Sequence, residues 1–171
     1  MSPVGNIVIR VATERDARSI SALIRRNAEV VLAKDYSPAQ LAAWTRYNTP
    51  GRIRHWMKST AVFVAQRAGR LCGTIGLEGR ELVGFYVSPS CRGQGIGKLL
   101  LAHLEAFATS KGIESLSLTS THSAKDFYSR HGWNAERHVV LTILGVDFEE
   151  TLMTKKLTSF DYHKVDEGRK P

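Results

Sequence analysis

The sequence predicts one α/β domain, of the α+β kind in which helices cover the faces of a mixed sheet. Runs that alternate like strands are interleaved with amphipathic runs of helical spacing, in the order β–α–α–β–β–β–α–β–α–β–β. A glycine-rich turn joins one of these strands to the longest helical run. With 171 residues, of which 43% are hydrophobic, the chain is long enough to bury a single sizeable core.

The first third of the chain predicts one strand followed by helices. Residues 7–12 alternate between apolar and polar side chains, as a short strand does. Thr13 is typical of an N-cap, and apolar residues recur at helical spacing after it, so we expect a helix at about 14–33. The serine–proline pair at 37–38 marks a second short helix, and a third helical piece is expected within 49–59.

The rest of the domain predicts an antiparallel meander and then alternating helices and strands. Three strand-like runs are separated by "AG" and "EG" pairs, which favour tight turns. The expected strands are 61–67, 71–77, 80–87, 113–120, 135–144 and 147–157, with helices at 95–110 and 124–131. We therefore expect a single domain at 1–157 and a polar C-terminal tail at 158–171.

The composition argues against several classes of protein. Apolar runs fall short of the ~20 residues of a membrane span. The N-terminus lacks the long apolar core of a signal peptide, so we expect a cytoplasmic protein. Cys72 and Cys91 form no CxxC pair, and neither a disulfide nor a metal site is expected.

The net charge of +8 is unevenly distributed. Residues 1–60 carry ten Lys or Arg against four Asp or Glu, whereas residues 111–171 carry nine of each. Solvated basic helix faces account for this excess, with an anionic substrate or RNA as alternatives. Nucleic-acid binding is not the first expectation, because the chain has no dense basic run with interleaved aromatic residues.

The stretch "RGQGIGK", Arg92–Lys98, stands where a strand passes into a helix. Glycine weakens a helix by roughly 0.5–1 kcal/mol per residue, so its presence here needs a reason. A glycine-rich turn at this position points several backbone N–H groups at one spot beside the positive end of the helix dipole. Gly95 and Gly97 would let phosphates approach the backbone, and Lys98 adds charge. The turn predicts a phosphate or pyrophosphate site, although glycines that merely permit a tight turn are the alternative.

Two common phosphate-binding motifs do not fit this turn. A Walker loop needs Ser or Thr after its lysine, and here Leu99 follows Lys98. A dinucleotide fingerprint needs GxGxxG inside a parallel βαβ unit, whereas "GQGIGK" follows strands that we expect to be antiparallel. The anion site should therefore be of another kind.

Residues Arg92–Gly97 match the pattern [RQ]-x-x-G-x-[GA], and with them the sequence resembles the GNAT family of acetyl-CoA-dependent N-acetyltransferases. The resemblance spans roughly residues 6–157. It includes "FYVSPSCRGQGIG", the element "SAKDFYSRHGW" at 123–133 and the closing "LMTKKL" at 152–157. It implies the GNAT fold, in which the central parallel strands splay apart, and an enzyme that moves an acetyl group from acetyl-CoA directly to a primary amine.

The resemblance also implies where the cofactor binds. The amides of Gly93 to Lys98 would cradle the coenzyme A pyrophosphate. The preceding strand carries a bulge and would pair its exposed backbone with the pantetheine arm, and an amide near Val87 would hold the acetyl carbonyl. Family members often have Asn where this sequence has Thr121, so that contact is expected to be weaker. The implied cofactor-binding residues are Phe85, Tyr86, Val87, Arg92, Gly93, Gln94, Gly95, Ile96, Gly97, Lys98 and Thr121; no metal is expected.

Two residues are candidates for proton transfer. Tyr128 lies in "AKDFYSRHGW", which resembles the family element whose tyrosine lies close to the coenzyme sulfur, and would act as general acid. Glu81 lies six residues before Val87, at an offset where several family members carry a glutamate base that acts directly or through water. Alternation along the strand would put Glu81 on the same face as Phe85 and Val87. The alternatives are a tyrosine packed in the core and an exposed glutamate at a strand end.

The acceptor is left open by the sequence. It would be a primary amine of a small molecule or a protein, bound largely by the first helices at about 25–58, as the resemblance implies. An alkylamine with a pKa of ~10 is neutral in only about one molecule in a thousand near pH 7, so a base is useful. A homodimer is compatible with the resemblance. The alternative of another class is a non-catalytic acyl-CoA-binding sensor or scaffold.

Overall fold

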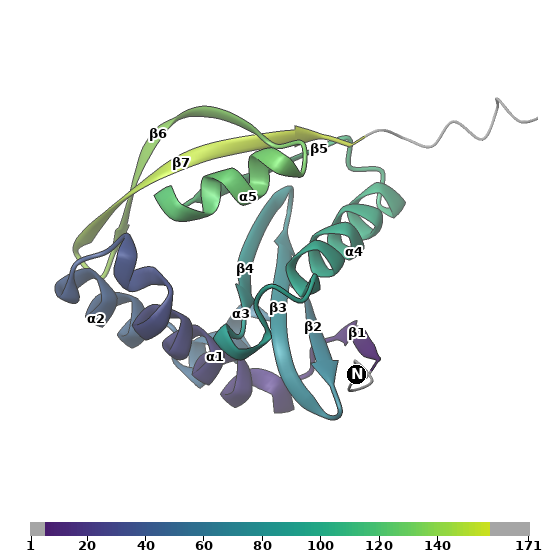
Figure 1. Ribbon diagram of the computed structural model, residues 1–171, viewed down its shortest axis with the longest axis horizontal. Helices are drawn as coiled ribbons and strands as arrows, with labels where there is room; N and C mark the ends of the chain where they lie inside the picture. Colours follow the sequence, from purple (N-terminus) through teal and green to yellow (C-terminus); the bar gives the residue numbers. More distant parts are fainter. Residues whose placement is uncertain (1–5, 158–171) are drawn as a thin grey trace, which may run out of the picture.

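The computed structural model describes residues 6–157, which form a mixed seven-stranded sheet flanked by helices (Figure 1). The strands are β1 (Ile7–Val11), β2 (Ala61–Arg67), β3 (Arg70–Glu78), β4 (Glu81–Val87), β5 (Ser115–Ser120), β6 (Asn134–Ile143) and β7 (Val146–Lys156). The helices are α1 (Ala17–Val30), α2 (Pro38–Tyr47), α3 (Pro50–Trp56), α4 (Ile96–Ser110) and α5 (Lys125–Arg130). Short 3-10 turns lie at Glu14–Asp16, Leu32–Lys34, Pro89–Cys91 and His122–Ala124. The polar tail expected at 158–171 lies outside the described residues.

The predicted fold class is confirmed, and so is the predicted order of elements except that the helical piece expected within 49–59 forms a third helix, α3, before β2. The strands are arranged β1-β2-β3-β4-β5-β7-β6, and among the described residues β4 and β5 form the parallel pair. The helix expected at 14–33 is divided into a 3-10 turn, α1 and a second 3-10 turn. Its first turn is tight because the Asp16 carboxylate accepts a hydrogen bond of 2.7 Å from the backbone N–H of Thr13.

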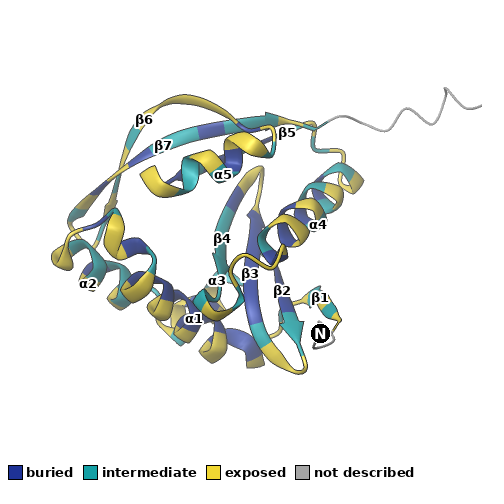
Figure 2. Cartoon of the chain, in the orientation of Figure 1, coloured by how far each residue is buried: buried dark blue, intermediate teal, exposed yellow. Residues whose placement is uncertain are grey.

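The helices lie on both faces of the sheet. Side chains of a strand alternate between faces, and on β2 Val62 and Val64 pack with α1, whereas Phe63 and Ala65 pack in the core cluster that contains α4. Ile53 of α3 joins the first cluster. Figure 2 shows the buried residues along β2 and β3 and on the sides of α1 and α4 that face them. The resulting layers are helix, sheet and helix, as the sequence predicted.

A bulge in β4 changes which side chains share a face. Gly76 pairs with Val83, but the next pair joins Thr74 to Tyr86, so two residues of β4 lie opposite one residue of β3. Gly84 at the bulge has φ of 58°, and a Cβ there would lie 2.3 Å from Cη2 of Trp56. The expectation that Glu81 shares a face with Phe85 and Val87 is therefore wrong, because strict alternation holds only in a strand without a bulge.

The two central parallel strands diverge, as the family resemblance implied. The register joins β4 to β5 at Glu81 and Ser117 alone. Beyond this pair β5 continues along β7 as far as Ser120, while β4 continues along β3 as far as Val87. Among residues 6–157, the edge of β4 that faces β5 consequently has no strand partner between residues 83 and 87, and Figure 1 shows the opening between the two ribbons.

The C-terminal hairpin closes one end of this opening. Phe148 of β7 is fully buried between Tyr36 and Trp44, with ring centroids 5.0 and 5.4 Å away. This contact fixes α2 and the segment before it against the β6–β7 hairpin. Over residues 6–157, no helix combines the length and the hydropathy that crossing a membrane requires.

Candidate functional site

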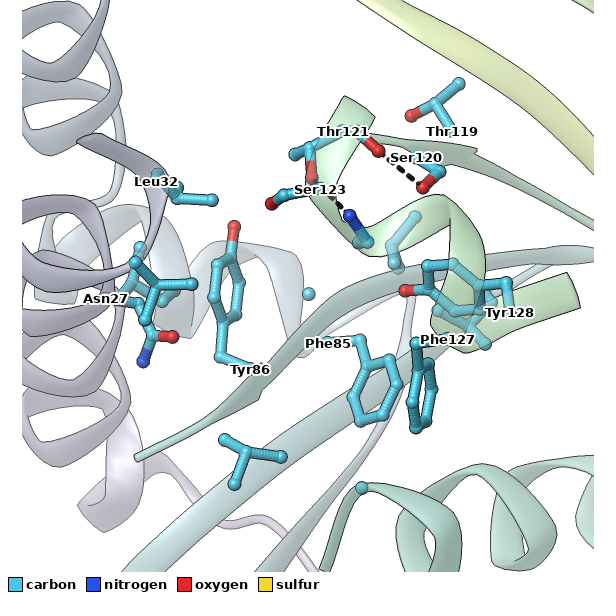
Figure 3. A pocket seen from close by; sticks show the side chains of 18 of the residues that line it. Asn27, Leu32, Phe85, Tyr86, Thr119, Ser120, Thr121, Ser123, Phe127 and Tyr128 are labelled. Carbon is cyan, nitrogen blue, oxygen red and sulfur yellow. Dashed lines mark hydrogen bonds between the residues drawn. The ribbon is translucent and has the colours of Figure 1, made fainter. Parts of the chain in front are cut away.

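A cavity of about 850 Å³ lies where β4 and β5 diverge. Its walls come from α1 and α3, the bulge of β4, the glycine-rich turn, the end of β5 and α5. Figure 3 shows Tyr86 between the side of Asn27 and Leu32 and the side of Thr121 and Ser123, with Tyr128 across the cavity. Most of the residues that the sequence singled out are brought together here.

The glycine-rich turn lies exposed at the mouth of the cavity. Gly95 is the N-cap of α4 and has φ of 77°, a left-handed conformation that favours glycine. A Cβ built on Gly95 would meet nothing within 4 Å, so its surroundings are open. The first amides of a helix have no carbonyl partner within the helix. The fully buried Ile96 packs in the core and anchors this end of α4. The turn therefore presents bare backbone and the positive helix end to the cavity, an arrangement suited to an anion.

The implied cofactor residues do not all reach the cavity. Those that line it are Phe85, Tyr86, Val87, Arg92, Gly93, Gly95, Ile96, Gly97, Lys98 and Thr121. Gln94 is absent from the lining, because its side chain accepts a hydrogen bond of 2.5 Å from Arg67 and donates one to the carbonyl of Ser90. Thr121 caps the turn before α5 by accepting a hydrogen bond from the Ala124 amide at 3.3 Å. Its hydroxyl hydrogen is left for another acceptor.

Tyr128 points its hydroxyl into the cavity (Figure 3). Only 7% of the residue is exposed, and its ring packs against Phe127, Trp133 and Phe85 with centroid distances of 5.4, 6.0 and 6.1 Å. Burial raises the pKa of the phenol, and the negative charge of Glu150 raises it further. The hydroxyl therefore stays protonated at neutral pH, which is the state that a proton donor requires.

Glu81 is exposed at the start of β4 and lines the edge of the cavity. Partial burial raises the pKa of its carboxyl, and the charges of Glu78 and Glu150 raise it further. Its side chain lies before the bulge, on the face of the sheet opposite Phe85, and not on the face that the sequence predicted.

A buried carboxylate that the sequence analysis did not single out belongs to the same cavity. Glu150 of β7 is 6% exposed, and its Oε1 accepts a hydrogen bond of 2.6 Å from the hydroxyl of Tyr36. The sequence carried one signal for it: Glu150 follows Phe148 by two residues in a strand, so the two share the inward face. Strand alternation could not identify the hydrogen-bond partner of Glu150, because Tyr36 lies 114 residues away along the chain.

Most of the charged side chains around the cavity are divided by sign. Arg92, Lys98 and Arg130 line the side of the glycine-rich turn and α5, whereas the three carboxylates of the lining, Glu78, Glu81 and Glu150, come from β3, β4 and β7. The first side is thus suited to an anionic ligand, whereas the opposite side combines these three carboxylates with one guanidinium, that of Arg52 on α3. Within the described residues, no group of three or more His, Cys, Asp or Glu side chains could hold a metal ion.

Comparisons with known proteins found relatives of this chain in sequence and in fold. The family model for the acetyltransferase (GNAT) domain matches residues 32–142. Glucosamine 6-phosphate N-acetyltransferase of Trypanosoma brucei brucei is 30% identical over 155 residues, which cover 84% of this chain and 100% of that protein.

Solved structures share the fold. A GCN5-related N-acetyltransferase from Rhodopseudomonas palustris superposes with a TM-score of 0.85 at 24% identity, covering 92% of this chain and 99% of that one. The PaiA N-acetyltransferase of Thermoplasma acidophilum, solved in complex with coenzyme A, has a TM-score of 0.77 at 22% identity, covering 88% of this chain and 99% of that one.

Proposed function

The chain belongs to the GNAT family of acetyltransferases and uses acetyl-CoA as its acyl donor, and on this premise we propose how its residues divide the reaction. In our proposal one domain, residues 1–157, transfers the acetyl group directly to a primary amine without a covalent intermediate on the protein. The observation that carries the proposal is the cavity itself, with the glycine-rich turn at one end, the unpaired edge of β4 along it and the Tyr128 hydroxyl inside it.

The donor would bind along the turn and the free edge of β4. The amides from Gly93 to Lys98 would hold the pyrophosphate, helped by the charges of Arg92 and Lys98. The pantetheine arm would pair with the backbone of Phe85, Tyr86 and Val87, whose outer edge has no strand partner. A backbone N–H at this edge would stabilise the negative charge that develops on the acetyl carbonyl oxygen. Thr121 would donate its free hydroxyl hydrogen to the cofactor.

Tyr128 would act as the general acid. Its ring is held by the aromatic cluster around it, and its hydroxyl faces the cavity that the thioester would enter. As the tetrahedral intermediate collapses, the thiolate leaves and takes a proton from this hydroxyl.

Glu81 would act as the base through water. It lies at the solvent-exposed edge of the cavity, and its raised pKa makes its carboxylate a better proton acceptor than that of an ordinary glutamate. Protons from the amine would leave the site by this route.

The acceptor would bind on the side of α1, α2 and α3. Arg52 of α3 lines this side and lies 3.6 Å from the centre of the Tyr47 ring. An exposed guanidinium here suits an acceptor that also carries an anionic group, as the substrate named in the trypanosomal relative does. Glucosamine 6-phosphate is therefore the first acceptor to test, and unphosphorylated glucosamine is its matched comparison.

The test is thiol release from acetyl-CoA with a panel of primary amines that includes these two sugars. At least one amine should be acetylated, and Tyr128→Phe should lower kcat by about 100-fold. The same variant should leave the Kd for acetyl-CoA and the melting temperature unchanged, since only the hydroxyl is removed. If the protein binds acetyl-CoA and no amine consumes it, the proposed transfer is wrong; if acetyl-CoA does not bind, the donor site is wrong as well.

A further inference from the structure

We propose, on the basis of the function above, that Glu150 binds the ammonium group of the acceptor and takes its proton, with Tyr36 positioning the carboxylate. The acceptor is accordingly a primary amine that enters the cavity as a cation. This assigns a residue outside the motifs of the sequence, on β7, to the acceptor half of the site.

The burial of Glu150 is the first argument. The residue is 6% exposed, and removing a carboxylate from water costs several kcal/mol unless a cation or several hydrogen bonds compensate for it. Within residues 6–157 the structure gives this carboxylate one hydrogen bond, from Tyr36, and no ion pair. The partner that it lacks is a cation, and the cavity is the place from which a cation can reach it.

The walls around Glu150 are the second argument. Leu32, Trp44 and Leu141 line the cavity and belong to one apolar cluster with Tyr36, the hydrogen-bond partner of Glu150. The ring of Tyr36 packs edge-on against Phe148 in the same cluster. Apolar walls exclude water, so an ion pair formed here is screened far less than one at the surface. An amine on a compact apolar or sugar body would therefore be held chiefly through its nitrogen.

The reach of the Glu150 charge is the third argument. After burial, this charge is the next cause that raises the pKa of Tyr36, Tyr86 and Tyr128, and after Glu78 it also raises that of Glu81. Glu150, the proposed acid and the proposed base all line the same cavity. The charge of Glu150 therefore acts on both groups that would handle protons.

The two glutamates then have different tasks. Glu150 is inside the cavity and removes a proton from the ammonium, which leaves a neutral amine and a carboxylic acid. Glu81 is at the exposed edge, beside Glu78, and passes that proton on to water.

The two protons that the acceptor nitrogen loses are accounted for by Glu150, Glu81 and Tyr128. The neutral amine attacks the carbonyl carbon of the thioester, so a C–N bond forms and the carbonyl electron pair moves to oxygen. Collapse of the intermediate breaks the C–S bond, and Tyr128 protonates the thiolate. The second proton of the nitrogen returns to Tyr128, and the first leaves from Glu150 by way of Glu81. While Glu150 is protonated, its charge no longer opposes a phenolate at Tyr128, which makes the phenol a stronger acid at the step that needs it.

The probes are thioethers of coenzyme A that carry the acceptor charge on the donor. S-(2-aminoethyl)-CoA, S-(3-aminopropyl)-CoA and S-(4-aminobutyl)-CoA extend an ammonium from the sulfur into the cavity, and the matching S-propyl, S-butyl and S-pentyl thioethers are neutral. Isothermal titration should show that at least one amino thioether binds the wild-type protein about tenfold or more tightly than its neutral match. Glu150→Gln should abolish this ratio, because glutamine keeps the hydrogen bond from Tyr36 and loses the charge.

Two further variants separate the charge from the fold. Glu149→Gln changes the neighbouring carboxyl of the same strand, which is exposed, and should leave the ratio as in the wild type. Tyr36→Phe should reduce the ratio without abolishing it, as expected for a positioning residue. Equal affinity for charged and neutral thioethers at every length, or a ratio that survives in Glu150→Gln, overturns the inference and leaves the donor site intact. If none of the thioethers binds, the donor site is wrong and the inference falls with it.

Discussion

The proposed donor side and the proposed acceptor side of the cavity are built in different ways. The proposed donor side comes largely from one stretch of chain, Phe85 to Lys98, which presents backbone: the free edge of β4 and the amides of the turn into α4. The Thr121 hydroxyl adds one side chain to it. The acceptor side is made of side chains from elements far apart in sequence, such as Tyr36, Trp56 and Glu150. A backbone site suits a ligand that never changes, and a side-chain site can be altered for each new acceptor.

The first prediction, with the largest expected effect, tests whether the donor is bound by the exposed backbone of the glycine-rich turn. A side chain placed in this turn should then prevent binding. Gly95→Val places a branched side chain where the pyrophosphate would lie, and we expect the Kd for acetyl-CoA to rise by about 1000-fold or more, roughly 4 kcal/mol. Calorimetric titration measures it.

Gly112→Val is the matched control for this variant. Gly112 has φ of 74°, close to the 77° of Gly95, and a Cβ there also meets nothing within 4 Å. It lies beyond the C-terminus of α4, far from the turn in sequence. Both variants should lose a similar free energy of unfolding, but the control should keep its affinity for acetyl-CoA. Equal loss of affinity in both would mean that strain in the helix, and not occupation of the cradle, explains the effect.

The second prediction concerns the place where the two sides touch. Trp56 of the acceptor side packs against the bulge of β4, and a Cβ at Gly84 would lie 2.3 Å from its ring. We expect Gly84→Ala to lower the free energy of unfolding by about 3 kcal/mol, from backbone strain together with the overlap with Trp56. Urea unfolding measures this.

Gly79→Ala isolates the overlap from the strain. Its φ of 59° is almost that of Gly84, yet a Cβ there meets nothing within 4 Å. It should therefore cost only about 1 kcal/mol. The double variant Gly84→Ala/Trp56→Leu should lose less than the sum of its single changes. Equal costs at residues 79 and 84 would show that Trp56 yields easily and does not fix the bulge.

The third prediction uses the pH dependence of the acceptor side. If Glu81 must be ionised to accept protons, kcat/KM falls as pH drops through its pKa. Because burial and Glu78 raise this pKa, the acid limb should lie above the ordinary glutamate value of about 4.3. Glu81→Gln should lower kcat/KM by about tenfold at pH 8 and remove this limb.

Glu78→Gln sharpens the same measurement. Loss of a neighbouring negative charge lowers the pKa of Glu81, so the acid limb should move to lower pH. An unchanged limb in both variants would assign it to another group. Neither change should affect the Kd for acetyl-CoA, since both residues lie on the acceptor side.

The sequence predicts the backbone of the proposed donor side better than the side chains of the proposed acceptor side. The turn at Arg92–Lys98 and the start of α4 could be predicted because caps, glycines and strand endings act over a few residues. The face of Glu81 was predicted incorrectly, because one extra residue at the bulge reverses the alternation and no local signal placed it against Trp56. Glu150 was missed because it is recognisable as a site residue only from its burial and its hydrogen bond with Tyr36, and only the tertiary fold creates that contact.

The last prediction concerns an ion pair outside the cavity. It serves as a control for the effect of lost stability on ligand binding. Arg10 and Asp16 form a two-pronged ion pair with both distances 2.8 Å, and neither residue lines the cavity. The hydrogen bonds from Arg10 are the main cause that lowers the pKa of Asp16 to about 2. Because the pKa of Asp16 is lower in the folded protein than in the unfolded chain, the ionised carboxylate stabilises the fold at pH values above the unfolded pKa of about 3.9. This stabilisation is lost as the pH falls from about 3.9 towards about 2.

Asp16→Asn should therefore lower the free energy of unfolding by about 1 kcal/mol at pH 7, after allowance for solvent screening of the partly exposed Arg10. The difference from the wild type should shrink between pH 4 and pH 2 in urea titrations. At pH 7 the variant should bind acetyl-CoA and the amino thioethers as the wild type does. A change in either affinity would mean that lost stability alone disturbs the cavity, and the effects at Gly95 and Glu81 would then have to be measured against that baseline.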